Sequence, residues 1–252
     1  MIQFRANFFS DVLGISTSAT ILLPQETSAQ IGLTGNVRER TPVLYLLHGY
    51  SDDDTIWTRR TSIERYASDR GLAVVMPSVD TSFYCDERYG KAYWTYVSEE
   101  LPALVTRTFN VSDAREDTFV AGLSMGGYGA FKLALRHPGR FAAAGSLSGA
   151  LDMATRHVQE QPGLDHTAVW GDTPVRGTGD DLVHLLSTAD PASLPRMWMT
   201  CGTEDILVDD NRAFLAAAEA AGVHIESDWR PGEHEWGYWD ATIQDFLAFA
   251  LD

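Results

Sequence analysis

The chain has 252 residues, of which 44% are hydrophobic and 11% aromatic, enough to bury the core of one large domain over residues 1–252. Its 19 basic and 35 acidic residues give a formal net charge of −16, which argues against binding to nucleic acids or anionic membranes. No segment reaches the roughly 18 unbroken apolar residues of a membrane span, and residues 1–10 lack the pattern of a signal peptide. We therefore expect a soluble, cytoplasmic protein.

Two predicted strands open the chain, at residues 1–10 and 16–23, without a helix between them. After them, apolar runs typical of buried strands alternate with segments of helical spacing. Further strands are expected at residues 42–47, 72–77, 118–120, 142–147, 197–201 and 223–229. Helices are expected at residues 61–70 and 94–109, from just after Ser124 to residue 136, and at residues 181–186, 211–221 and 242–251. This alternation predicts an α/β fold with a mainly parallel sheet of about eight strands, helices on both faces and an antiparallel edge.

Residues 149–195 interrupt the alternation of strands and helices. The segment is rich in proline and glycine, and only residues 181–186 have clear helical spacing. An irregular insertion of this length in a compact domain is usually functional. Because it follows one strand and precedes the next, we expect it to act as a lid over a site.

The sequence Gly122-Leu123-Ser124-Met125-Gly126 lies between an expected strand and an expected helix. A strand that turns sharply into a helix with a serine at the apex is the nucleophile elbow of α/β-hydrolases. The serine must adopt a strained backbone conformation, and the flanking glycines leave room for that turn. A glycine-rich turn with an incidental serine is the alternative, but it explains neither the strand before nor the helix after. We therefore predict that Ser124 is a nucleophile.

An activated serine needs a base and a group that orients the base. In α/β-hydrolases these follow the serine in the order acid, then histidine. Glu204 and Asp205 both follow the strand at residues 197–201, so both are candidates for the acid, and an N-cap is the alternative role for Asp205. His234 lies between the last strand and the last helix, where the base is expected. The histidines in the insertion and at element ends are weaker candidates: His137, His157, His166, His184 and His224.

Two backbone N–H groups are expected to stabilise the oxyanion of an acyl-transfer reaction. One belongs to the residue after the nucleophile, which is Met125. The other comes from the loop after the strand at residues 42–47, and we assign it to Tyr50. His48 lies in the same loop and is expected to be a packing residue that shapes it.

Aromatic residues suit concave binding sites for small esters. Trp57, Tyr84 and Trp236 are candidates for substrate binding, with core packing as an equal or better alternative for each. Trp170 in the insertion is a further candidate.

Other polar and sulfur-containing residues have simpler interpretations. Asp52-Asp53-Asp54 lacks the glycine and distal glutamate of a calcium loop, so a solvated acidic loop is expected. Cys85 and Cys201 have no metal or redox spacing, and we expect two free thiols. A serine nucleophile of this design requires no metal and no cofactor.

Several longer stretches of the sequence, in addition to the elbow motif, match one known group of proteins. The sequence resembles the esterase D-like, tributyrin-esterase group, which includes S-formylglutathione hydrolases, short-chain acyl esterases and feruloyl esterases. The resemblance covers nearly the whole chain, is weakest over residues 151–195, and rests on residues 43–49, 99–102, 122–130, 201–205 and 232–240. It implies that Asp205 is the acid and that Tyr50 and Met125 supply the oxyanion donors. An aliphatic residue is common in the group where Tyr50 stands, so the implication extends to the backbone of Tyr50 and not to its side chain.

The residues and the resemblance together predict a serine carboxylesterase that hydrolyses short-chain acyl or acetylated sugar esters through an acyl-enzyme. A feruloyl esterase is the nearest alternative, favoured if the insertion presents aromatic residues such as Trp170 to the acyl group. An S-formylglutathione hydrolase fits less well, because an anionic thiol ester would need a basic pocket and basic residues are few. A non-catalytic binding protein of the same fold would lack the serine, the histidine or the acid of the catalytic group, and candidates for all three are present here. The expected partner is a small ester, and the oligomeric state is left open, homo-oligomers included.

Overall fold

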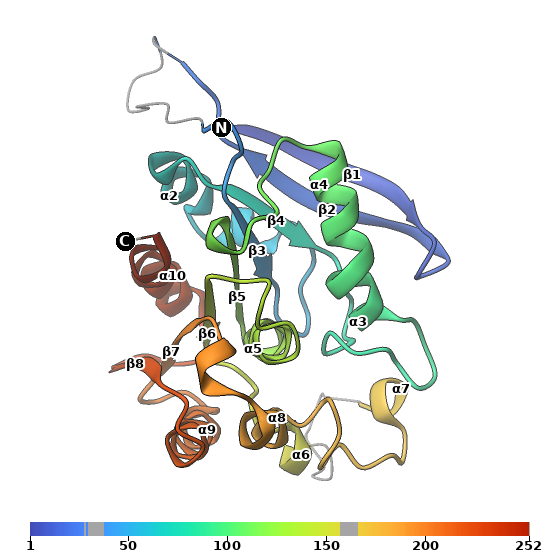
Figure 1. Cartoon of the computed structure of the whole chain (residues 1–252), viewed down its shortest axis with the longest axis vertical. Helices are drawn as coiled ribbons and strands as arrows, with labels where there is room; N and C mark the ends of the chain where they lie inside the picture. The colour runs from blue at the N-terminus through green and yellow to red at the C-terminus, as the bar shows by residue number, and fades with distance from the viewer. Residues whose placement is uncertain (28, 30–37, 157–165, 252) are drawn as a thin grey trace.

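The structure is a computed structural model that describes residues 1–27, 29, 38–156 and 166–251 (Figure 1). Its centre is an eight-stranded sheet with the order β1-β2-β4-β3-β5-β6-β7-β8. The strands are β1 (Ile2–Ser10), β2 (Ile15–Leu23), β3 (Val43–Leu47), β4 (Ala73–Pro77), β5 (Thr118–Leu123), β6 (Ala143–Leu147), β7 (Arg196–Gly202) and β8 (Ile225–Arg230).

The sheet is parallel except at one edge. β1 pairs with β2 in antiparallel fashion, and β2 pairs with β4 in the same way. All the pairs from β4 to β8 are parallel. The predicted sheet of about eight strands with an antiparallel edge is therefore confirmed.

Helices cover both faces of the sheet, and β3 shows why. Val43, Tyr45 and Leu47 belong to one hydrophobic cluster, whereas Leu44 and Leu46 belong to another. The first cluster includes residues of α4 (Leu101–Thr108), α5 (Met125–Arg136), α8 (Leu182–Thr188) and α9 (Val208–Ala220), and the second includes residues of α1 (Ile56–Arg60), α2 (Ile63–Arg70) and α10 (Trp236–Leu251). A strand covered on both faces is apolar throughout, as this one is. In Figure 1, α2 and α10 lie to the left of β3 and β5, and α4 lies to the right of them.

The helix predicted over residues 94–109 is divided into three parts. A short helix, α3 (Tyr93–Thr95), passes into a π-helical turn at Tyr96–Glu100 and then into α4. Pro102 lies in the first turn of α4 and has no N–H to donate to the carbonyl of Ser98. That carbonyl accepts a hydrogen bond from the guanidinium of Arg140 instead. The proline thus explains a break that apolar spacing alone did not predict.

Two predicted helices begin earlier than expected, and a short helix outside the insertion, α1, was not predicted. α9 starts at Val208 rather than at residue 211, and α10 starts at Trp236 rather than at residue 242. The carboxylate of Glu235 accepts hydrogen bonds from the N–H groups of Gly237 and Tyr238, which caps α10. This cap offsets the low helix propensity of Gly237. The short helix α1 lies in a segment for which no helix was predicted.

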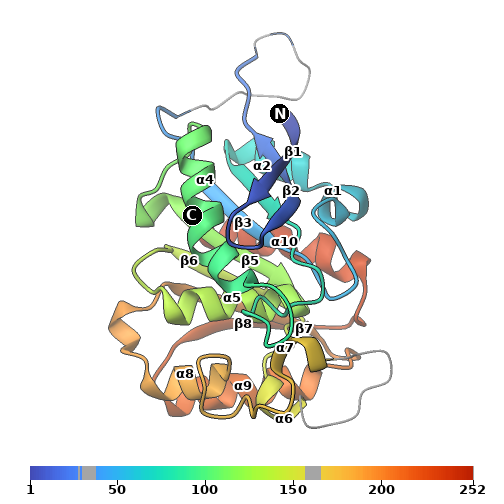
Figure 2. The same cartoon turned by 90° about the vertical axis from the view of Figure 1, so that its right-hand side faces the viewer.

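The insertion contains more regular structure than predicted. Its described part holds α6 (Met153–Arg156), α7 (Thr167–Trp170), α8 and a 3₁₀ turn at Pro191–Ser193. Asp181 caps α8 by accepting a hydrogen bond from the N–H of His184. These helices gather with α9 at the lower end of the molecule in Figure 2. Residues 157–165, with His157, lie outside the described residues, and the role of the insertion as a lid stays a prediction.

Two smaller predictions concern the cysteines and the membrane. Cys85 and Cys201 are both buried and both free, which confirms the prediction of two free thiols. In the described part of the chain, no helix has the length and apolar character that a membrane span requires.

Candidate active site

Ser124 lies at the apex of the turn from β5 into α5. Its backbone has φ 52° and ψ −117°, a strained conformation for a residue with a side chain. A Cβ atom at Gly122 would lie 2.4 Å from the carbonyl group of Gly126, and one at Gly126 would lie 2.4 Å from the carbonyl oxygen of Leu47. Only glycine therefore allows the helix to start so close to β3 and β5, as the elbow motif predicted.

The structure brings Ser124, His234 and Asp205 into one chain of hydrogen bonds. The Ser124 hydroxyl lies 3.1 Å from Nε2 of His234. Nδ1 of the same ring lies 3.0 Å from Oδ2 and 3.1 Å from Oδ1 of Asp205. Because a carboxylate only accepts, Nδ1 carries the proton and Nε2 accepts from the serine. In this arrangement the imidazole can remove the hydroxyl proton as the serine attacks a substrate.

Asp205 remains charged in this environment. It is buried, and burial alone would raise the pKa of its carboxyl group. The hydrogen bond and charge of His234 lower the pKa, as do the N–H of Leu207 and the hydroxyl of Ser148, and together they place it below its ordinary value. An ionised Asp205 can hold the proton on Nδ1 and stabilise an imidazolium.

Glu204, the competing candidate for the acid, points elsewhere. Its side chain is exposed and accepts hydrogen bonds from the N–H of Gly232, at 2.7 Å, and from the hydroxyl of Thr203. The N–H of Glu204 in turn donates to the carbonyl of Gly232 at 3.1 Å. Glu204 therefore joins the loop after β7 to the loop that carries His234, and it is Asp205 that contacts the imidazole.

Met125 and Tyr50, the two predicted oxyanion donors, line the same pocket as Ser124. Met125 is the first residue of α5, a position at which the backbone N–H has no acceptor within the helix. Tyr50 follows β3 and lines the same pocket as Ser124 and Met125. Backbone N–H groups in such positions suit a negatively charged oxygen.

His48 shapes the loop that carries Tyr50. It is buried, its Nδ1 lies 2.7 Å from the carbonyl oxygen of Gly49, and its Nε2 lies 3.1 Å from the N–H of Val79. These partners make Nδ1 the donor and Nε2 the acceptor of a neutral ring. Burial lowers the pKa of His48 and thereby favours the neutral form. The predicted packing role agrees with this geometry.

A pocket of about 720 Å³ opens over Ser124 and His234. Its lining is apolar on the whole, with a few polar groups, as is usual for sites that bind small molecules. The apolar members are Phe83, Leu123, Met125, Ala150, Met153, Ile206, Leu207, Trp236 and Trp239. The polar side chains are those of Tyr50, Ser51, Asp52, Arg60, Arg156, His166 and Glu235.

Of the four aromatic residues predicted to bind substrate, Trp236 lines this pocket and three do not. Trp57 is buried, with its indole N–H bonded to the carbonyl of Leu47 and its ring packed edge-on against Trp236. Tyr84 is completely buried, and its hydroxyl donates to the carbonyl of His48. The prediction for these two is corrected, because a side chain without exposed surface cannot contact a substrate.

Trp170 is the third of these residues. Its indole N–H donates to Asp180, and its ring packs against Phe83 and His166, which line the pocket. Trp170 is therefore buried behind the two residues that line the pocket and does not line it itself. No sequence pattern identifies Phe83, and the place of His166 in an irregular segment gives no sign of a role in the pocket. Trp239 is missed by sequence reasoning because α10 is predicted to begin after it.

The acidic loop is not solvated throughout, contrary to expectation. Asp54 is buried and accepts hydrogen bonds from the hydroxyls of Ser18 and Thr20, and it pairs with Arg5. A buried carboxylate requires such partners. It therefore ties α1 to the antiparallel edge of the sheet.

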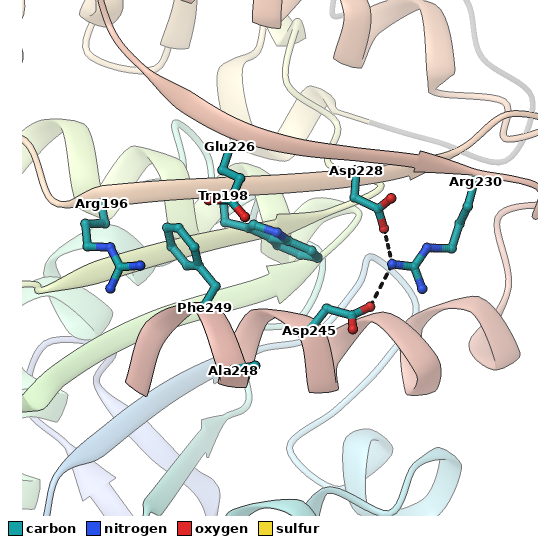
Figure 3. Close-up of a pocket in the computed structure, with 8 residues that line it drawn as sticks. All are labelled: Arg196, Trp198, Glu226, Asp228, Arg230, Asp245, Ala248 and Phe249. Carbon is teal, nitrogen blue, oxygen red and sulfur yellow. Dashed lines mark hydrogen bonds and ion pairs between the residues drawn. The ribbon is translucent and has the colours of Figure 1, made fainter. Parts of the chain in front are cut away.

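A second hollow, of about 490 Å³, lies between β7, β8 and α10 and shares no lining residue with the pocket over Ser124 (Figure 3). In it, Arg230 is paired with both Asp228 and Asp245. The guanidinium of Arg196 lies 4.3 Å from the centre of the Phe249 ring. These charged groups already have partners within the protein, and the lining offers no nucleophile next to a base. We therefore place the candidate chemistry at Ser124.

Comparison with known proteins supports the fold and the class of reaction. A family model described as "Putative esterase" matches residues 10–250. An acetyl esterase of Caldicellulosiruptor saccharolyticus is 28% identical over 257 residues, 96% of each chain. The fluorophosphonate-binding serine hydrolase FphF of Staphylococcus aureus is 33% identical with a TM-score of 0.91, over 100% of this chain and 98% of its own. The S-formylglutathione hydrolase FrmB of the same organism is 33% identical with a TM-score of 0.87, over 100% and 99%. The chain therefore belongs to the esterase family and is a carboxylic ester hydrolase with the α/β-hydrolase fold.

Proposed function

We propose that this protein is a serine carboxylesterase in which Ser124 is the nucleophile, His234 the general base and Asp205 the group that orients it. The observation that carries the proposal is the unbroken hydrogen-bonded chain from the Ser124 hydroxyl through the imidazole to the Asp205 carboxylate. Ser124 attacks the ester carbonyl while His234 takes its proton. His234 then returns the proton to the leaving alcohol, and water hydrolyses the acyl-enzyme by the reverse transfers.

The negative oxygen formed in each step needs donors that are already in place. We assign this role to the backbone N–H groups of Met125 and Tyr50, at the start of α5 and in the loop after β3. Each such donor is worth roughly 3 kcal/mol of transition-state stabilisation in comparable sites. Because the donors are backbone groups, changes to these two side chains are poor tests of the role.

Short-chain acyl esters and acetylated sugar esters are the proposed substrates. The relative from Caldicellulosiruptor saccharolyticus is named an acetyl esterase, which supports this choice. A feruloyl ester is less favoured, because Trp170 is buried behind Phe83 and His166 and is not available to stack on a phenolic acyl group. The apolar pocket nevertheless has room for acyl chains of different length.

S-formylglutathione is a second candidate substrate. The scarcity of basic residues argues against it, but Arg60 and Arg156 both line the pocket. Arg156 is paired with Asp210, so Arg60, which is exposed, is the better placed of the two to meet an anionic substrate. Initial rates on p-nitrophenyl acetate, p-nitrophenyl butyrate, methyl ferulate and S-formylglutathione would rank these classes. The proposal for short-chain esters is wrong if S-formylglutathione has the highest kcat/KM.

Replacement of Ser124 tests the nucleophile directly. We expect Ser124→Ala to abolish hydrolysis of p-nitrophenyl acetate and labelling by a fluorophosphonate probe, because both need the hydroxyl. The hydroxyl forms part of the pocket wall, so its loss leaves no internal cavity, and the thermal unfolding midpoint should change little. A Ser124→Ala protein that still turns over the ester at the parental rate would contradict the assignment. A wild-type protein that fails to react with the probe would favour a non-catalytic binding protein.

A further inference from the structure

We propose that Ser148 is a positioning residue for the proposed reaction, which holds Asp205 in place while the indole of Trp239 fixes the direction of the Ser148 hydroxyl. The inference rests on the proposed function, because it extends the chain of hydrogen bonds that runs from Ser124 to Asp205. The two side chains that it adds are those of Ser148 and Trp239. Trp239 lies in one of the stretches that carry the family resemblance, but the resemblance implies no role for either residue.

Ser148 lies at the rim of the sheet, next to the loop that carries Asp205. It directly follows β6, and its N–H donates to the carbonyl of Thr200 in β7 at 2.7 Å. Asp205 follows the end of the same strand, β7. Ser148 is completely buried. Its hydroxyl is therefore fixed between two parallel strands at their carboxyl ends, where the active sites of α/β sheets form.

The direction of the Ser148 hydroxyl follows from its neighbours. The indole N–H of Trp239 donates to its oxygen at 3.1 Å, so the hydroxyl proton must point to another group. Two nearby groups can accept that proton, the carboxylate of Asp205 and the sulfur of Cys201, and the Ser148 hydroxyl lowers the pKa of each. Burial raises the pKa of Cys201 to about 12, so this residue stays a neutral thiol and a weak acceptor. An ionised carboxylate is the stronger acceptor, so we infer that the hydroxyl of Ser148 donates to Asp205.

The Asp205 carboxylate is then held from several sides. Its Oδ1 accepts from the N–H of Leu207 at 2.8 Å, and both oxygens face Nδ1 of His234. A further donor from Ser148 leaves the carboxylate little freedom to turn away from the imidazole. Trp239 acts on the base as well, because its ring packs edge-on against His234 with 4.8 Å between ring centres. One indole thus contacts the base and, through Ser148, the acid.

The backbone of Ser148 supports a role for its side chain. Its φ is 49°, in the left-handed region where glycine is easily accommodated and serine is uncommon. Such strain is typical of sites where the side chain has a function. Glycine at this position would keep the turn and remove the hydroxyl, which provides a variant that separates the two effects.

The first test compares Ser148→Ala with Ser148→Gly. Both remove the hydroxyl, but glycine also relieves the backbone strain. We expect kcat for p-nitrophenyl acetate to fall by about tenfold or more in both, as a lost hydrogen bond to a charged group predicts, with KM unchanged. The rate of fluorophosphonate labelling should fall in parallel, because it reports the reactivity of Ser124 and not the binding of the ester.

The matched control is Ser146→Ala. Ser146 lies in β6, is completely buried, and its hydroxyl has no hydrogen-bond partner within the described part of the protein. Removing it should leave kcat unchanged. Trp239→Phe is a second variant: it keeps an aromatic ring against His234 and removes the N–H, and we expect a loss of kcat smaller than that of Ser148→Gly. Unchanged kcat in Ser148→Gly would overturn the proposal.

A double-mutant cycle shows whether Ser148 acts through Asp205. If it does, Ser148→Gly slows labelling of Ser124 in the wild-type background and has no further effect in an Asp205→Ala background. Equal losses in both backgrounds would overturn the proposed path through Asp205. The failure of the proposed function would look different, because Asp205→Ala alone would then retain wild-type activity.

Discussion

Two adjacent carboxylates in this protein have different partners because their side chains point to opposite sides of one turn. Asp205 is buried and contacts His234, whereas Glu204 is exposed and accepts the N–H of Gly232. The position after β7 could not separate them, because both residues follow the strand within the same turn. The contact between a carboxylate and an imidazole from a distant loop exists only in the folded chain.

Amide substitutions distinguish the two carboxylates. We expect Asp205→Asn to lower kcat by about 10⁴-fold, because an amide can favour the wrong tautomer of His234. Glu204→Gln keeps an oxygen that accepts the Gly232 N–H, so its kcat should fall by less than about tenfold. Steady-state kinetics on p-nitrophenyl acetate would check both. A larger loss in Glu204→Gln than in Asp205→Asn would refute the choice of Asp205.

The turn from β5 into α5 shows how tertiary contacts override helix propensity. Gly126 lies in the first turn of α5, where alanine would ordinarily be favoured. Here a Cβ atom would lie 2.4 Å from the carbonyl oxygen of Leu47 and 2.8 Å from that of His48. The helix can therefore approach β3 only with glycine at this position. The approach is what presents the start of α5 to the pocket.

The sign of the stability change at Gly126 tests whether close packing or helix propensity dominates. Gly126→Ala should destabilise the protein by about 1–3 kcal/mol as an overpacked site does, although propensity alone predicts a gain. Gly139→Ala is the control, because open space surrounds its Cβ position. Urea unfolding followed by circular dichroism would measure both changes. Gly126→Ala with unchanged or increased stability would mean that the strand and the helix have room to separate.

At the scale of the whole molecule, one buried ion pair joins the insertion to the sheet domain. Lys132 of α5 is completely buried and lies 2.6 Å from the carboxylate of Asp180 in the insertion. Burial alone would raise the pKa of Asp180, but the charge of Lys132 outweighs it and lowers that pKa below its ordinary value. The indole N–H of Trp170 also donates to Asp180. The wall of the pocket thus depends on this contact.

The lowered pKa of Asp180 predicts a dependence of stability on pH. A carboxyl whose folded-state pKa is depressed contributes stability above its unfolded value, and the contribution disappears as the pH falls through the folded-state pKa. Asp180→Asn should therefore cost about 3–5 kcal/mol at pH 7, because it leaves Lys132 buried without a charge partner. The difference from the wild type should shrink below about pH 4, near the ordinary aspartate pKa.

Urea unfolding of the wild type and Asp180→Asn between pH 7 and pH 3 would measure this dependence. Asp209→Asn is the matched control, because that carboxylate is exposed and its pairing with Arg212 lies at the surface. We expect little change for it at any pH. A stability difference between Asp180→Asn and the wild type that grows on acidification would contradict the expected sign.

The sequence by itself determined the sheet, its antiparallel edge and the elbow at Ser124. These follow from patterns within short segments: apolar runs for covered strands, and glycines around a serine between a strand and a helix. It also indicated His234, because the order of catalytic residues along the chain is a property of the fold.

Only the tertiary structure decided which carboxylate meets the imidazole and which aromatic residues reach the pocket. Trp57 and Tyr84 were reasonable candidates, yet both are covered by neighbours distant in the sequence. Ser148 follows β6 and Trp239 belongs to α10, so the two residues meet only when α10 packs against the sheet near the carboxyl ends of its parallel strands. The physical reason is that burial and hydrogen-bond partners depend on long-range contacts, whereas apolar spacing and turn motifs are local.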